Sequence, residues 1–307
     1  MSLQFLHFLA LPDHSKPGGF DHAAIHPFSN RLYVAHTVND AVDVIDCASD
    51  QYLYSIQGLI GIAGALVSVE RNLVFTSNRG ENTVGIFPID DEKNLVKVAV
   101  GVRPNGLSFD QQHGLLLVAN VGNPDIPGSL TLSIVDINRN AMIHSIPVPG
   151  RTRWAVYNTE KEVFYVNISD PPQIMTVKAV EANRIAQTLE IPASGPHGLD
   201  LDSENQRLFC ACDAGKLFVV DLETHRITGE ASLSGAPDVI FYNADLNHLY
   251  VAIGDPGVID VFETLTLKKL ETIPTEKGAH TIAFNPQVNM VYAFLPQTHT
   301  AAVYQDG

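Results

Sequence analysis

The chain has 307 residues, of which 45% are hydrophobic and 17% are charged, and its formal net charge is −15. This hydrophobic content is enough to form a core, so the composition excludes an intrinsically disordered chain. A strongly negative surface repels nucleic-acid backbones and anionic membranes, so we expect neither as a partner. The three cysteines have no CxxC spacing and predict neither a disulfide framework nor a zinc knuckle.

The first segment, residues 3–11, is a short apolar run that is typical of a β-strand. It has no preceding basic region and is too short for a signal peptide. No later apolar run approaches the ~20 residues that a transmembrane helix needs. We therefore expect a cytoplasmic protein.

From residue 22 onward the chain repeats one unit of four short strands seven times. In each unit an inner strand follows a Pro- or Gly-rich corner, a second strand is rich in Leu, Tyr, Val and Ala, and two more strands follow polar turns. The aligned inner strands begin at residues 22, 64, 105, 154, 197, 238 and 280. The blades of a β-propeller repeat every ~40–45 residues, and such small sheets bury both faces only in a closed ring.

The longest interval in this series contains an insertion, residues 121–128, between the second and third strands of the third unit. The seventh unit ends with its third strand and lacks a fourth. Residues 3–11 can supply that strand, which would close the ring and leave no free strand edge at the joint. The sequence therefore predicts an all-β fold with a single domain, residues 1–307: a seven-bladed β-propeller whose N-terminal strand completes the last blade.

The clearest repeat, residues 32–46, reads Leu-Tyr-Val-Ala, then Asp after four intervening residues, and ends Val-Asp-Val-Ile-Asp. This pattern resembles the YVTN-type β-propeller repeat, and the whole chain is similar to lactonase-type seven-bladed propellers. Two units depart from the pattern, since they begin with Gly64 and Trp154. The resemblance implies a propeller that acts as a lactonase-like hydrolase, although this architecture hosts many unrelated functions.

The first residues of the seven inner strands should surround one mouth of the central channel. Three of them, His22, His197 and His280, are histidines, although the chain has only 12 histidines in 307 residues. Three imidazoles with one open position form a typical catalytic metal centre. One prediction is therefore a site in which these three residues bind one divalent transition-metal ion. The alternative is that the histidines bond water or substrate directly.

The same positions supply candidate catalytic residues, namely His22, His197, Asp238 and His280. A histidine–aspartate pair can remove a proton from a substrate, and a bound metal ion can polarise a carbonyl group. Both steps occur in lactone hydrolysis and in elimination reactions.

Candidate substrate-binding residues lie on the same face. Arg153 is a candidate clamp for a carboxylate or phosphate, and Trp154 is a candidate stacking wall. The alternative for Arg153 is an ion pair with an acidic residue of a neighbouring loop. Asn105 at the start of an inner strand, and His36 and Asn120 at the ends of second strands, complete the candidate set.

Two functions follow from this reading. The first is an enzyme, a lactonase-like hydrolase or a lyase, that acts on a small anionic organic molecule at the channel mouth. The alternative is a non-catalytic platform that binds a ligand or a protein on the same face. We expect residues 121–128 to overhang the mouth and to form a pocket there with Arg153 and Trp154.

Overall fold

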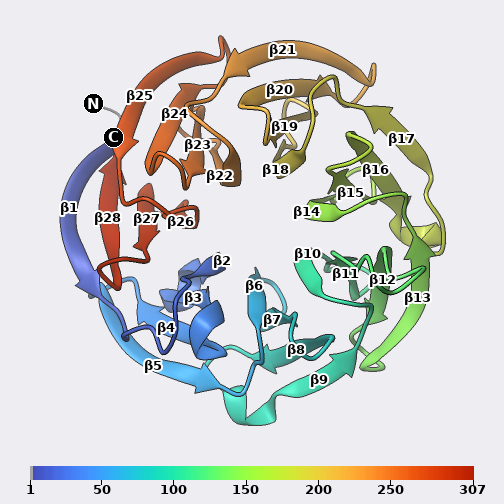
Figure 1. Ribbon diagram of the computed structural model, residues 1–307, viewed down its shortest axis with the longest axis horizontal. Coiled ribbons are helices and arrows are strands. Elements are labelled where there is room, and N and C mark those ends of the chain that lie inside the picture. Colours follow the sequence, from blue (N-terminus) through green and yellow to red (C-terminus); the bar gives the residue numbers. More distant parts are fainter. Residues whose placement is uncertain (1–2) are drawn as a thin grey trace.

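The computed structural model describes residues 3–307, which form a ring of seven four-stranded antiparallel sheets around a central channel (Figure 1). The predicted fold class is therefore confirmed. Every inner strand begins within two residues of its predicted start. Residues 1 and 2, which the predicted domain includes, lie outside the described residues.

In six of the described blades the four strands follow one another along the chain and run from the channel outwards; in the seventh, β1 is the outer strand. Blades 1 to 4 comprise β2 (Asp21–His26), β3 (Arg31–His36), β4 (Ala41–Asp46) and β5 (Gln51–Gln57); β6 (Ile62–Ser68), β7 (Leu73–Asn78), β8 (Thr83–Pro88) and β9 (Val96–Ala99); β10 (Pro104–Asp110), β11 (Leu115–Asn120), β12 (Thr131–Asp136) and β13 (Ala141–Pro147); and β14 (Thr152–Asn158), β15 (Val163–Ile168), β16 (Gln173–Lys178) and β17 (Gln187–Glu190).

Blades 5 to 7 comprise β18 (Pro196–Asp202), β19 (Arg207–Cys212), β20 (Lys216–Asp221) and β21 (Arg226–Ser232); β22 (Pro237–Asn243), β23 (His248–Ile253), β24 (Val258–Glu263) and β25 (Lys268–Pro274); and β26 (Ile282–Asn285), β27 (Met290–Leu295), β28 (Thr300–Asp306) and β1 (Leu3–Ala10). The described helices are short 3-10 turns in the connections: η1 (Pro27–Ser29), η2 (Thr37–Asn39), η3 (Glu92–Asn94) and η4 (Ala179–Glu181). Across residues 3–307 no helix is long and apolar enough to cross a membrane.

The two ends of the described chain meet in the last blade. Strand β1 pairs antiparallel with β28, from Leu3 opposite Asp306 to Ala10 opposite Thr300 (Figure 1). Leu3 and Leu9 are buried in the cores on either side of this blade. The predicted closure of the ring by the N-terminal strand is therefore confirmed.

The hydrophobic core lies between adjacent blades rather than inside any one of them. Each cluster of buried residues joins the facing sides of neighbouring sheets; Leu117 and Val166, for example, pack together between blades 3 and 4. Antiparallel pairing also defines the two faces of the ring. The beginnings of the inner strands and the ends of the second strands share one face, called the mouth face here, and the ends of the inner strands share the rear face.

Candidate functional site

The inner strands are irregular where they begin, on the mouth face. Six of the seven described inner strands shift their pairing register within their first residues. His22, Arg153, His197 and Asp238 all lie within these irregularities. A β-bulge re-aims the side chains that it contains, so these residues turn toward the axis instead of alternating across the sheet.

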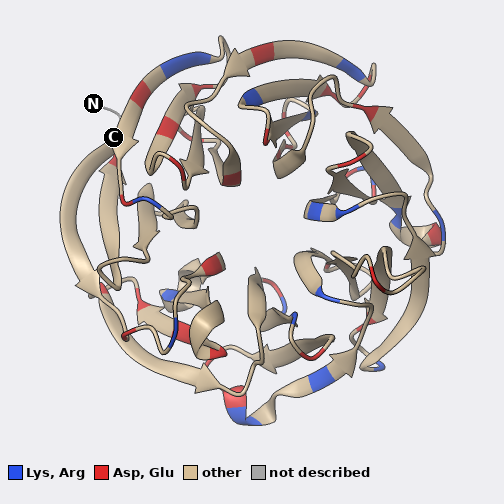
Figure 2. Ribbon diagram, viewed as in Figure 1, with Lys and Arg blue, Asp and Glu red and all other residues tan. Residues whose placement is uncertain are grey.

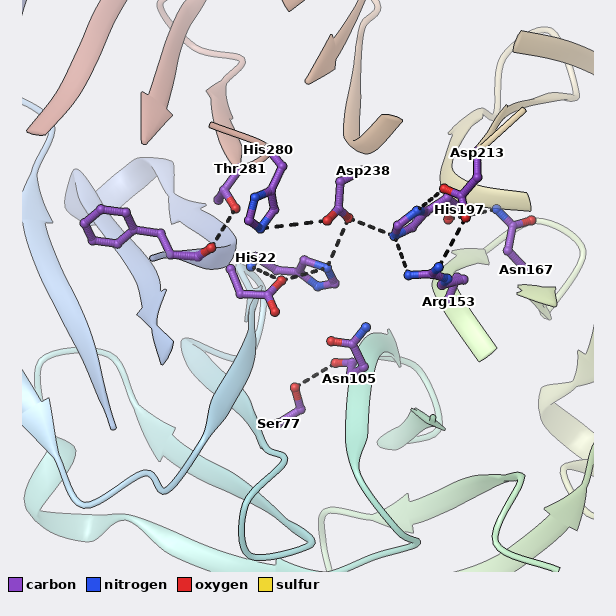
Figure 3. A network of polar contacts seen from close by, with 12 residues as sticks. His22, Ser77, Asn105, Arg153, Asn167, His197, Asp213, Asp238, His280 and Thr281 are labelled. Atoms are coloured by element: carbon purple, nitrogen blue, oxygen red, sulfur yellow. Dashed lines mark hydrogen bonds and ion pairs between the residues drawn. The ribbon is translucent and has the colours of Figure 1, made fainter. Parts of the chain in front are cut away.

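Asp238 lies at the centre of the cluster at the mouth (Figure 3). Its carboxylate oxygens lie 3.1 Å from Nε2 of His197, 4.0 Å from Nε2 of His22 and 3.9 Å from Nε2 of His280. Burial alone would raise the pKa of Asp238, but the three imidazoles outweigh burial and hold the pKa far below its ordinary value. The structure thus brings all four candidate catalytic residues together around one carboxylate.

His197 is held between two carboxylates. Its Nδ1 lies 2.7 Å from Asp213, and its Nε2 faces Asp238. Burial opposes the charged imidazole, yet Asp238 and the hydrogen bond to Asp213 outweigh burial and raise the pKa of His197 to about 9. Nη1 of Arg153 also lies 3.0 Å from Nε2. Nε2 can either accept a hydrogen bond from Arg153 or donate one to Asp238, but it cannot do both. Because each ring nitrogen faces a carboxylate, the protonated ring is favoured, in which both nitrogens donate.

His280 differs from the other two histidines because one of its ring nitrogens is available. Its Nδ1 donates a hydrogen bond of 2.7 Å to the carbonyl oxygen of Gly278, which fixes the proton on Nδ1 when the ring is neutral. Its Nε2 then carries the lone pair, 3.9 Å from Asp238. The side chain is 36% exposed, the highest value among the three imidazoles. His280 is therefore the imidazole that can exchange a proton with a ligand.

His22 is packed into the wall of the channel. Its side chain is 5% exposed, and its ring lies 4.3 Å from the ring of Trp154. Nε2 of His22 lies 3.3 Å from Asp21. Burial lowers the pKa of His22 despite the nearby carboxylates of Asp21 and Asp238, so the ring is neutral at pH 7. Trp154 thus lines the channel beside His22 instead of standing at the rim.

The cluster does not have the geometry of a metal centre. Within residues 3–307 no three His, Cys, Asp or Glu side chains are arranged to hold a metal ion. A histidine ligand must be unprotonated, so metal binding by His197 would have to displace the proton that the two carboxylates favour on its ring. Metal binding by His22, His197 and His280 stays a prediction, which metal analysis of protein purified without a histidine tag tests directly.

Arginines gather on one side of the mouth. Nη2 of Arg79 donates to Oδ1 of Asn105 at 2.6 Å and lies 3.5 Å from Asp21. Arg103 and Arg151 immediately precede inner strands β10 and β14. Figure 2 shows these basic segments near the axis by β10 and β14, across from the acidic starts of β2 and β22. The mouth therefore has a basic side and an acidic side.

The electrostatics confirm that the guanidinium groups lie close to one another. Burial lowers the pKa of Arg79, and the charges of Arg103 and Arg151 lower it further. Arg151 is exposed as a whole residue, but desolvation of part of its side chain lowers its pKa, as do the neighbouring Arg153 and Arg103. Clustered like charges favour the binding of an anion, which would relieve their repulsion.

The inserted loop forms a cavity of about 630 Å³ on the mouth face. Most of its lining is apolar, including Ile126 and Pro127 from the loop, and its charged residues are Arg103, Arg151 and Asp170. Neither guanidinium makes a hydrogen bond or ion pair with another residue between 3 and 307. The loop thus shapes a pocket beside the mouth, as its position suggested, but the pocket uses Arg103 and Arg151.

The remaining candidate residues have other partners. Arg153, whose Nη2 lies 3.2 Å from Asp213, makes the ion pair considered as its alternative role. Asn105 is buried beside the cluster, where it accepts the hydrogen bond from Arg79. Its backbone oxygen also accepts a hydrogen bond from Ser77.

His36 and Asn120 are not part of the cluster. Both side chains are fully buried between strands of their own blades. Nδ1 of His36 lies 2.7 Å from Asp43, and Nδ2 of Asn120 donates to Thr131 and Ser133. In the structure these two residues stabilise the second and third strands and do not contact the space at the mouth.

Sequence reasoning did not single out Asp21 and Arg103. The carboxylate of Asp21 lies 3.5 Å from Nη2 of Arg79 and 3.3 Å from Nε2 of His22. Arg103 lines the pocket of the inserted loop. Arg103 and Arg151 occupy equivalent positions in their blades, since each directly precedes the first residue of an inner strand. In the sequence alignment these arginines lie two residues before Asn105 and three residues before Trp154, so the pair lines up only when the repeats are aligned on the observed strand starts.

No protein-family model matches the chain, and no curated protein matches it. Among solved structures, hydrazine synthase from Kuenenia stuttgartiensis is similar, with a TM-score of 0.81 over 96% of this chain and 97% of that chain. The two sequences are 12% identical. At this level of identity the likeness shows the propeller fold alone.

Proposed function

We propose that this protein is an enzyme that acts on a small organic anion at the mouth face by proton transfer, as a lactonase-like hydrolase or a lyase. The observation that carries the proposal is His280: the Gly278 carbonyl fixes its tautomer, its Nε2 is free, and the side chain is partly exposed. The resemblance to YVTN-type and lactonase-type propellers agrees with this function by analogy only.

The residues divide the work as follows. Nε2 of His280 accepts a proton from water or from a carbon next to a carboxylate, and Asp238 stabilises the imidazolium that forms. Negative charge then develops on a substrate oxygen, where protonated His197 and the arginines at the mouth lower its energy. In hydrolysis that oxygen belongs to a tetrahedral intermediate, and in elimination it belongs to an enolate that expels the leaving group.

One observation favours the second candidate, a non-catalytic binding platform. The axis at the mouth is filled, since His22 and His197 are 5% and 12% exposed and both contact carboxylates of the chain. The open cavity lies beside the axis, under the inserted loop. A ligand bound only there would contact Arg103 and Arg151 without reaching His280.

The test is a comparison of the wild-type protein with His280→Gln on a panel of lactones and hydroxycarboxylates, followed by proton release and by absorbance of a new double bond. We expect the variant to lose turnover by about 100-fold or more while it retains its fold, because a general base contributes ~10²–10⁴ in rate. His113→Gln, a histidine on the rear-face turn of blade 3, is the matched control. Turnover that survives in His280→Gln would show that His280 is not the general base. An anion that binds without any turnover by the wild type would favour the platform.

A further inference from the structure

The central channel contains two adjoining cavities, neither of which is lined by the arginines of the mouth. The larger, about 540 Å³, lies toward the rear face, and the smaller, about 190 Å³, reaches His22. Leu66, Leu107, Trp154 and Phe241 line both cavities. The larger volume falls within the range of ~300–1,000 Å³ that is typical of small-molecule sites.

The walls of these cavities are apolar and aromatic. Every blade contributes to them, and six lining residues carry aromatic rings: Phe28, Phe109, Trp154, Tyr157, Phe241 and Phe284. The face of an aromatic ring is negative and attracts a cation within ~6 Å of its centre. Arg71 shows this contact at the rear rim, where its guanidinium carbon lies 5.8 Å from the centre of the Phe109 ring.

The charged groups that line the cavities are carboxylates. Asp200 lies in the wall of the larger cavity and Glu70 at its exposed rim, while no lysine or arginine is among the lining residues. Asp200 accepts hydrogen bonds from the backbone N–H groups of Leu201 (2.8 Å) and Tyr242 (2.7 Å). Among residues 3–307 it has no cationic partner.

Burial raises the pKa of Asp200 to about 6, against the effect of the two backbone N–H groups. The carboxyl group is therefore still mostly ionised at pH 7. An ionised group in an apolar wall is costly unless a counter-ion accompanies it. The structure offers no such ion from the chain itself, which leaves the position open to a ligand.

From this juxtaposition we infer that the rear end of the channel binds a small organic ammonium ion, with Asp200 as its counter-ion and the aromatic walls around its apolar body. Phe241 is the aromatic wall chosen for the test, because its ring lines both cavities and the next residue, Tyr242, donates its N–H to Asp200. This site is separate from the proposed anion site, since the two use different faces and different residues.

The test uses full-length protein and three probes of similar size and different charge: benzylammonium, benzyl alcohol and benzoate. Binding is followed by calorimetry and by the fluorescence of Trp154, which is the single tryptophan and lines the channel. We expect benzylammonium to bind at least about tenfold more tightly than benzyl alcohol, because only the cation makes a charge-assisted ion pair with Asp200. Its binding should also change the fluorescence of Trp154, which lines the cavity.

Three variants complete the experiment. Asp200→Asn should bring the affinities for benzylammonium and benzyl alcohol within about twofold of each other, while Glu190→Gln, which removes one exposed charge from β17, should keep the preference. Phe241→Leu should lower the affinity for benzylammonium several-fold. This variant tests the inference even if Asp200→Asn does not fold. Equal binding of cation and alcohol by the wild type, no saturable binding of benzylammonium, or an Asp200→Asn variant that folds and keeps the wild-type preference would each overturn the inference.

Discussion

The two ends of the central channel are built from the same seven strands and have opposite chemistry. At the mouth face the inner strands begin irregularly and present Asp238, three imidazoles and a group of arginines. Toward the rear face the same strands are regular, and their side chains line the channel with apolar and aromatic groups and the carboxyl of Asp200. The comparison of the two ends shows that a bulge of one or two residues is enough to change which side chains reach the axis.

This contrast also separates two kinds of ligand. A mouth with clustered guanidinium groups attracts anions, and a rear channel with carboxylates and aromatic rings attracts cations. Because each end depends on its own residues, variants at one end should leave binding at the other unchanged. The following predictions test that independence, beginning with the frame that both ends share.

Removing residues 3–10 should disrupt the sites at both ends of the central channel at once. Without β1 the outer edge of β28 is unpaired and the joint of the ring is open, so we expect loss of cooperative folding, not the loss of a loose tail. Thermal unfolding followed by circular dichroism provides the measurement. A truncated protein that melts within about two degrees of the full chain would contradict the role of β1 in closure.

The pair of His197 and Asp238 should make the free energy of unfolding of the protein depend on pH. The folded-state pKa of His197 is raised to about 9 from 6.5, so its contribution is fully present below pH 6.5 and is lost as the pH rises through 9. The loss is about 3 kcal/mol at most, since one pKa unit corresponds to ~1.4 kcal/mol. The pKa of Asp238 is lowered, so its contribution is present above pH 3.8 and is lost on acidification.

Urea unfolding at several pH values between 6 and 10 measures this dependence. In Asp238→Asn the decline in stability between pH 6.5 and 9 should be much smaller, while the exposed control Asp245→Asn should keep the decline of the wild type. An unchanged pH profile in Asp238→Asn would show that His197 does not depend on that carboxylate.

The pocket of the inserted loop should bind an anion with an apolar body, for which phenylsuccinate is the probe. Replacing Arg103 or Arg151 by Met should lower the affinity by about tenfold each, because a charge-assisted contact is lost while the apolar wall remains. Arg139→Met, on the exposed turn after β12, is the control. Binding that resists both substitutions would place the anion elsewhere on the mouth face.

At the rear end, Asp200→Asn should stabilise the ligand-free protein slightly at neutral pH. Because burial raises the folded-state pKa of Asp200 to about 6, the protein loses stability as the pH rises from 3.8 through 6, and the ionised group costs stability above that window. The pKa difference of about two units limits the gain to ~3 kcal/mol at pH 8. Because the amide nitrogen of Asn cannot accept one of the two backbone hydrogen bonds, we expect a gain of about 1 kcal/mol at pH 8 and none at pH 4, measured by urea unfolding. A variant that is less stable at pH 8 would show that the backbone N–H groups more than compensate for burial.

The fold could be predicted because its signal repeats. Seven apolar runs of similar spacing define the blades, and the missing fourth strand of the last unit points to residues 3–11. The cluster of His22, His197, Asp238 and His280 followed from the same alignment, since equivalent positions of a ring face the same axis.

The finer details of the site depend on register, which the alignment did not contain. Side chains alternate across a strand, so a shift of one residue moves a side chain to the opposite face. His36 and Asn120 end their strands on the mouth face, yet both point between strands and are bonded there. The bulge in β14 likewise directs Arg153 to Asp213 and Trp154 into the channel, and the pocket of the inserted loop is left to other arginines.

The closure of the ring has a consequence for how the chain folds during synthesis. Within the propeller, strand β1 is synthesised before all the other strands, whereas its partner β28, residues 300–306, is the last strand to be made. Until then Phe5, Leu6 and Phe8 belong to an unpaired, uncharged strand, which is the kind of segment that aggregates or recruits chaperones. The contact that completes the propeller has nearly the greatest sequence separation the chain allows, so ring closure should be a late and slow event in folding.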